Sequence, residues 1–237
     1  MYEYRNTIKK AFLIFLVLLF ISGCGGKLRN VADSNNNQTP PQNKEIPLNV
    51  VVPDVKEDDH VLGNENAPVT IIIYSDFQNP FAAQFSGKDG STEKAKNEFG
   101  DKLRIVFRHY PQDIINPLSE AAAEVSECAA EQEKFWEMHD KLFQNNLENK
   151  FTIAQFIQDA EELELNLEEF DNCLNTDKYE DKIKAALQEA EKIGLRGAPT
   201  IFINGKHIVG ALSYEDYEDD FGKEKGLKSI IKEALKK

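Results

Sequence analysis

The chain has 237 residues, of which 41% are hydrophobic and 10% are aromatic, enough for one domain of good size or two small ones. Its formal net charge of -13 argues against nucleic acid as a partner, because such binding depends on a basic surface that neutralises phosphates. The aromatic content argues against general disorder.

The N-terminal residues predict an export signal rather than part of a fold. A basic head precedes the unbroken apolar run 11–21, which has only about half of the ~20 residues that a transmembrane helix needs. The run ends in Ile-Ser-Gly-Cys24, which resembles the bacterial lipobox, in which the cysteine is diacylated and becomes the new N-terminus. We therefore expect a lipoprotein signal peptide over 1–23 and a lipid on Cys24, with an ordinary signal peptide or an uncleaved anchor as alternatives.

A polar segment follows the lipobox. Residues 24–48 are rich in Asn, Gln and Pro and have almost no apolar periodicity, so they cannot bury enough surface to offset the entropy of ordering. We expect a flexible tether here, with an ordered arm against the domain as the alternative. The pattern becomes globular over 49–237.

Two strands and one long helix are expected next. The β-branched run 69–74 is typical of a strand buried on both faces, and 103–108 is a second candidate. A long helical stretch is expected after Pro117, because one set of side chains recurs at helical spacing and would form a single buried stripe. This set contains Val125, Cys128, Gln132, Phe135, Met138 or His139, and Leu142.

Further helices follow in the second half. Thr152 with Gln155 three residues later is a capping-box pattern that predicts a helix start. A shorter helix is expected after Asn166, and the helical pattern then continues until Gly194.

The last part of the chain combines strands with a helix. Asn204-Gly205 lies between the β-rich runs 200–203 and 207–209, which is a strong hairpin signal. Residues 223–236 predict a closing helix. This order of elements fits one α/β sheet that carries a helical insertion.

Two segments make the fold specific. Ser-Asp-Phe-Gln-Asn-Pro-Phe-Ala (75–82) follows the first strand, and Gly-Ala-Pro-Thr (197–200) precedes the hairpin. Together they resemble the DsbA-like branch of the thioredoxin superfamily, in which the first segment usually is S-D-F-x-C-P-x-C and the second carries a cis-proline. The resemblance extends from about Val61 to the C-terminus. It implies an α/β, thioredoxin-like fold with a helical insertion over about 114–194.

The chain departs from the family where the family is catalytic. Asn79 and Ala82 stand at the two active-site cysteines, in the segment Asn79-Pro80-Phe81-Ala82. A thiolate is the nucleophile of disulfide exchange and a second thiol resolves the mixed disulfide, and neither an amide nor a methyl group can replace them. Ile73 occupies the place of a buried glutamate that helps family members to move protons. Thioredoxin-type chemistry is therefore expected to be absent.

Asn79-Pro80 has a structural interpretation. Asn is among the best N-cap residues and Pro is favoured at the first helical position, so the pair is a sound helix start. Contact of Asn79 with a bound peptide is the alternative. Gly87 and Gly90 should interrupt the helix before it resumes from Ser91.

The loop Ala198-Pro199-Thr200 keeps the family pattern. The resemblance implies that backbone beside the proline pairs with an extended substrate peptide, a mode of binding that needs no thiol. The alternative is that Pro199 only shapes a turn and holds Thr200 in the strand.

With Cys24 lipidated, Cys128 and Cys173 remain as a pair in an oxidising compartment. Some DsbA-like proteins carry a structural disulfide in the helical region, so the resemblance implies a Cys128–Cys173 bond. Two separate buried thiols are the alternative. A catalytic pair fits poorly, because both cysteines lie mid-helix on apolar faces without adjacent basic residues.

Neither a metal site nor a cofactor is expected. The four histidines, His60, His109, His139 and His207, show no metal-ligand spacing, and no Cys-x-x-Cys motif occurs. No phosphate-binding loop is recognisable.

These expectations combine into one hypothesis. The chain would be a DsbA-like lipoprotein of the bacterial envelope, anchored to a membrane and facing the periplasm or exterior, without thiol–disulfide oxidoreductase activity. It would bind an extended or partly folded peptide, or an envelope protein, at a groove formed by Phe77, Phe81 and the Pro199 loop. The alternatives are an oxidoreductase that acts through Cys128 and Cys173, and a structural envelope lipoprotein whose groove is unused.

Overall fold

The computed structural model describes residues 54–219 and 222–236. The expected signal peptide, the lipid on Cys24 and the tether lie outside the described residues and stay predictions. Within the described part of the chain, no helix has both the length and the apolar character to cross a bilayer.

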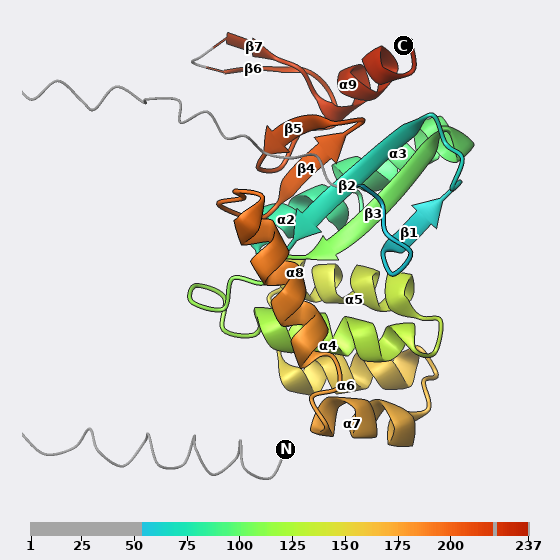
Figure 1. Cartoon of the computed structure of the whole chain (residues 1–237), viewed down its shortest axis with the longest axis vertical. Helices are drawn as coiled ribbons and strands as arrows, with labels where there is room; N and C mark the ends of the chain where they lie inside the picture. The colour runs from blue at the N-terminus through green and yellow to red at the C-terminus, as the bar shows by residue number, and fades with distance from the viewer. Residues whose placement is uncertain (1–53, 220–221, 237) are drawn as a thin grey trace, which may run out of the picture. The chain divides into compact units, whose positions relative to one another are not determined.

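A five-stranded sheet forms the centre of the domain (Figure 1). Its strands, in spatial order, are β1 (His60–Gly63), β3 (Leu103–His109), β2 (Val69–Ser75), β4 (Thr200–Ile203) and β5 (Lys206–Val209). The central β2 and β3 are parallel, and β1, β4 and β5 pair antiparallel to their neighbours. Because β2 and β3 run in the same direction, their carboxyl ends meet at one edge, where Ser75 lies beside His109.

Helices cover both faces of the two central strands, which explains their β-branched sequences. Ile71 and Ile73 pack in a cluster with α2 (Pro80–Ser86), α3 (Ser91–Phe99) and α9 (Leu227–Ala234). Ile72 and Tyr74 point to the other face and pack against α8 (Glu180–Lys192). The short 3-10 helix η1 (Gly100–Lys102) connects α3 to β3.

The helical insertion has its own core. It consists of α4 (Ser119–Ala130), α5 (Phe135–Leu147), α6 (Ile153–Glu162) and α7 (Leu167–Asn175), which Figure 1 shows stacked beside one end of the sheet. Phe107 of β3 and Phe77 join this core and connect it to the sheet. The fold confirms the expected α/β, thioredoxin-like architecture with a helical insertion.

The single long helix expected after Pro117 is wrong. The chain forms α4 and α5, separated by a turn over residues 131–134 in which Glu133 takes a left-handed conformation with φ 59°. The turn keeps Cys128 and Phe135 in the same core, so the apolar pattern runs on across the break. Periodicity alone does not reveal such a turn.

Other helix boundaries are confirmed. Thr152 caps α6 by accepting a hydrogen bond from the Gln155 backbone N–H at 3.2 Å, and Asn166 caps α7. The chain leaves helical geometry between α2 and α3, where Gly87 and Gly90 lie. Local side-chain chemistry therefore fixes these helix starts and breaks.

Two features escape the sequence patterns. β1 pairs with the edge of β3, and a second sheet consists of β6 (Tyr217–Asp219) and β7 (Gly222–Glu224). The closing helix therefore starts at Leu227 rather than at residue 223. These strands are short, so alternation has little length over which to appear.

Candidate functional site

The carboxyl end of β2 is held by one buried carboxylate. Asp76 Oδ1 accepts hydrogen bonds from the Gln78 N–H at 2.8 Å and the Ser119 hydroxyl at 2.6 Å. Its Oδ2 accepts from Asn116 Nδ2 at 2.7 Å and from the Gln112 N–H at 3.2 Å. These bonds fasten the loop before α4 to the segment that leads into α2.

Asn79 stands at the start of α2 and uses both ends of its amide. The Oδ1 atom accepts from the backbone N–H of Phe81 at 2.9 Å and of Ala82 at 3.1 Å. The Nδ2 atom donates to the Ala198 carbonyl at 3.0 Å. Pro80 is the first residue of the helix. Asn79 therefore caps α2 and ties it to the proline loop.

The second cysteine position holds no reactive group either. The Ala82 methyl is fully buried in the core that α2 shares with the helical insertion. Ile73 is also buried, so an aliphatic side chain occupies the place of the family's acid. Within the described residues, nothing at these three positions can attack a disulfide or accept a proton.

The proline loop lies against this helix start. The Ala198–Pro199 peptide bond is cis. The Thr200 hydroxyl donates to the Gly197 carbonyl at 2.7 Å, and the Gly210 N–H donates to the Pro199 carbonyl at 2.9 Å. The loop is thus closed by its own bonds, and one of its carbonyls already has the Asn79 amide as a donor.

Of the two phenylalanines expected in a groove, Phe81 is exposed and Phe77 is buried. Phe77 is only 1% exposed and stacks on Phe107 with ring centroids 4.9 Å apart, so its expected place in a groove is wrong. Its ring points into the core of the insertion because the Asp76 bonds fix the backbone there. Phe81, Ile114 and Ile115 are 62%, 95% and 68% exposed, and we call these three the apolar rim.

The two remaining cysteines are joined. Cys128 of α4 and Cys173 of α7 form a disulfide, and both side chains are buried among apolar residues. The bond fastens two helices of the insertion. The site residues of the proline loop and of the α2 start lie in other elements.

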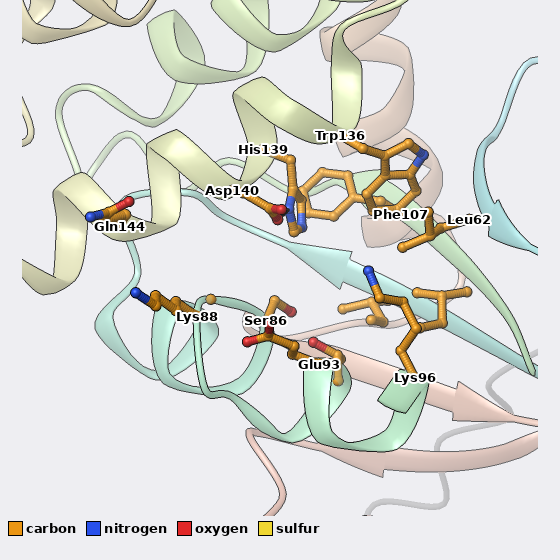
Figure 2. A pocket seen from close by; sticks show the side chains of 14 residues that line it. Leu62, Ser86, Lys88, Glu93, Lys96, Phe107, Trp136, His139, Asp140 and Gln144 are labelled. Atoms are coloured by element: carbon orange, nitrogen blue, oxygen red, sulfur yellow. Dashed lines mark hydrogen bonds and ion pairs between the residues drawn. The ribbon is translucent and has the colours of Figure 1, made fainter. Parts of the chain in front are cut away.

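A cavity of about 310 Å³ opens between α5 and the pair α2 and α3. Figure 2 shows Trp136 and His139 of α5 facing Lys96 and Ser86 across it, and Ile73 also lines it. Burial lowers the pKa of His139, although its bond to Asp140 opposes this, so the imidazole is neutral near pH 7.

A polar cluster in the interior was missed by the sequence analysis. Although the histidine spacing indicates no shared site, His60 of β1 and His109 of β3 both lie 2.9 Å from the same oxygen, Glu127 Oε1. Lys182 Nζ lies 2.8 Å from the other oxygen. Burial lowers the pKa of His109, whereas these hydrogen bonds hold the pKa of Glu127 well below its usual range despite burial. Only prediction of the β1–β3 pairing could have brought the two histidines together.

The fold and the α2 start define a DsbA-like thioredoxin-fold protein in which neither position of the Cys-x-x-Cys pair holds cysteine. A family model described as thioredoxin matches residues 55–219, and the chain belongs to this family, Thioredoxin_4.

The curated relatives are longer proteins. The chain is 33% identical over 171 residues to the Na(+)/H(+) antiporter NhaA 3 of Salinispora tropica, a match that covers 71% of this chain and 25% of that protein. It is 34% identical over 176 residues to the Na(+)/H(+) antiporter NhaA 1 of Mycobacterium sp. (strain KMS), covering 73% and 27%. The chain spans about a quarter of the length of these relatives.

Solved structures share the fold. BdbD from Bacillus subtilis has a TM-score of 0.61 and 22% identity, covering 75% of this chain and 92% of that one. A thioredoxin-like oxidoreductase from Silicibacter pomeroyi gives 0.59 and 18%, covering 76% and 92%. Wolbachia pipientis alpha-DsbA1 gives 0.58 and 24%, covering 77% and 92%. At these identities the likeness concerns the fold alone.

Proposed function

We propose that this protein is a non-catalytic member of its family that binds an extended peptide or a partner protein of the bacterial envelope. The observation that carries the proposal is the use of Asn79: its amide caps α2 and holds the Ala198 carbonyl, so the former nucleophile position is a structural connection. The Cys128–Cys173 disulfide does not replace the lost pair, because both sulfur atoms are buried away from any partner disulfide.

The apolar rim supports a binding role. Its three side chains lie on α2 and on the loop that Asp76 fastens beside the α2 start. All three side chains are large, apolar and mostly exposed, and aromatic anchors such as Phe81 dominate the binding energy of many interfaces. The partner would pack on the rim, and backbone pairing at the proline loop would add a second hydrogen bond to carbonyls that already accept one.

The proposal includes attachment to a membrane. The lipobox-like sequence before Cys24 is the support for it, and the polar segment 24–48 would hold the domain away from the lipid surface. Mass spectrometry of the purified chain should find a diacylated Cys24 at the N-terminus. An unmodified Met1 at the N-terminus would contradict membrane attachment, but it would not bear on the proposed binding role of the apolar rim.

The binding role is tested with the full chain in detergent and a fluorescent unfolded peptide. We expect Phe81→Ser to weaken peptide binding on the order of 10-fold or more, because the exposed aromatic anchor of the surface is lost. Leu167→Ser is the matched control, since Leu167 is a partly exposed apolar residue on α7. Equal affinities for the wild type and both variants would contradict the rim as the binding surface.

A further inference from the structure

The buried cluster of His60, His109 and Glu127 takes no part in the binding role proposed above. It draws one ligand from each of β1, β3 and α4, and the three ligand atoms lie within 4.8 Å of one another. We propose that these side chains form a binding site for a divalent transition-metal ion, for which Zn²⁺ is the best fit. Two imidazoles and one carboxylate are a ligand set that zinc accepts in proteins.

The two distances from the imidazoles to the carboxylate suit this ion after small movements, and the two imidazole nitrogens lie within 4.8 Å of one another. In a tetrahedral zinc site, bonds of 2.0–2.2 Å place neighbouring ligand atoms about 3.3 Å apart. The two contacts of 2.9 Å between the Nε2 atoms and Glu127 Oε1 would therefore open by about 0.4 Å. The ring proton on each Nε2 would move to Nδ1 or be released, because the metal binds the unprotonated nitrogen.

Neighbouring side chains already orient the ligands. The His60 ring stacks on Phe135 with centroids 3.4 Å apart and an interplanar angle of 5°. Lys182 holds Glu127 Oε2 at 2.8 Å, so that Oε1, which faces both imidazoles, would be the single oxygen ligand of the ion. Outer contacts of this kind fix ligand geometry in metal sites.

The fourth position of the ion would face a cavity. A space of about 280 Å³, lined by all three ligands and by Asp58, adjoins the cluster. Asp59 also lines this space, but both of its carboxylate oxygens accept hydrogen bonds of 2.7 Å from Arg108, so it is not available as a metal ligand. Water, or the exposed Asp58 carboxylate, would therefore complete the tetrahedron.

The test uses the full chain in detergent, stripped with a chelator and titrated with zinc chloride in a calorimeter. We expect one ion per chain with micromolar or tighter affinity. Glu127→Gln and His60→Gln should each weaken binding by about 100-fold, as loss of a ligand costs at least as much as loss of an outer contact. His207→Gln, which changes a histidine on β5 outside the cluster, should bind like the wild type. No binding in the micromolar range, or full affinity in both cluster variants, would overturn the proposal.

A second measurement needs no substitution and so does not depend on variants that fold. X-ray absorption of the zinc-loaded wild type should show two imidazoles and only nitrogen and oxygen ligands around the ion. Sulfur in the first shell, as from Cys24, or a shell without imidazole, would also overturn the proposal.

Discussion

At the scale of single residues, Asn79 explains how the start of α2 is held in place without a cysteine. In family members a cysteine stands here, where the helix N-terminus favours a thiolate. The Asn79 amide satisfies two orphan N–H groups of α2 and adds a bond to the Ala198 carbonyl. The helix start thus keeps its geometry without a reactive atom.

Glu124 on α4 makes stability depend on pH. Burial raises its pKa to about 7, and the neighbouring carboxylates of Asp177, Glu120 and Glu180 add to the rise. Because the folded pKa exceeds the usual value of 4.5, the folded state retains a proton that the unfolded state loses. Stability therefore falls as pH rises from 4.5 to about 7 and stays at the lower level above that.

Glu124→Gln removes this charge. We expect the free energy of unfolding to be unchanged near pH 4.5 and to increase by about 1 kcal/mol at about pH 8. This gain is smaller than the pKa shift alone would give, because Glu124 is partly exposed and solvent screens its charge. Urea denaturation at both pH values measures this, with Glu161→Gln on the exposed face of α6 as the control. A gain of equal size at both pH values would show that the charge is not the cause.

At the scale of elements, the disulfide connects α4 and α7, two helices that lie far apart in the sequence. Cys128 and Cys173 are separated by 45 residues. Closing a loop of this length lowers the entropy of the unfolded chain, worth about 4 kcal/mol in the chain-entropy model. We expect the double variant Cys128→Ala, Cys173→Ala to lose stability of this order in urea denaturation, and a reductant to destabilise the wild type similarly.

The same double variant bears on the redox alternative. If Cys128 and Cys173 carried out disulfide exchange, the wild type would reduce or oxidise a model peptide and the double variant would not. We expect neither protein to do so, since both sulfur atoms are buried. Turnover by the wild type alone would contradict this expectation.

Local chemistry made several elements predictable from the sequence. β2 and β3 follow from β-branched runs, and the starts of α6 and α7 follow from Thr152 and Asn166, because each signal lies within a few residues. The turn at 131–134 was not predictable, since the apolar pattern does not change there. The burial of Phe77 depends on partners 30 or more residues away, which no local pattern reports.

The same reasoning applies to the two sites. The loss of Cys-x-x-Cys and the helix start at Asn79 are visible in eight consecutive residues, 75–82. The approach of Asn79 to Ala198 needs the fold, which the family resemblance supplied. The closeness of His60 and His109 could not be predicted in this way, because β1 is short and its pairing with β3 is a long-range contact.

At the scale of the whole molecule, the proline loop and the α2 start lie together as the thioredoxin-like fold requires, although Ile73 replaces the buried acid. The loop at Pro199 faces the start of α2, and positions 79 and 82 have the spacing of the family's cysteines. We expect Asn79→Cys with Ala82→Cys to create thiol–disulfide exchange activity, because the helix N-terminus would favour the new thiolate. Turnover of a model disulfide peptide measures it, with Asn79→Ser and Ala82→Ser together as the control. A folded double-cysteine variant without activity would show that more than the thiols has been lost.

The amide at position 79, where the family has a thiol, also determines how a partner would leave this surface. An oxidoreductase holds its substrate covalently for part of each cycle and lets go when a second thiol attacks. An amide forms no such covalent adduct and is neither oxidised nor reduced in thiol–disulfide exchange. The lifetime of any complex here is therefore set by dissociation alone, and its occupancy follows the local concentration of the partner rather than the redox poise of the compartment.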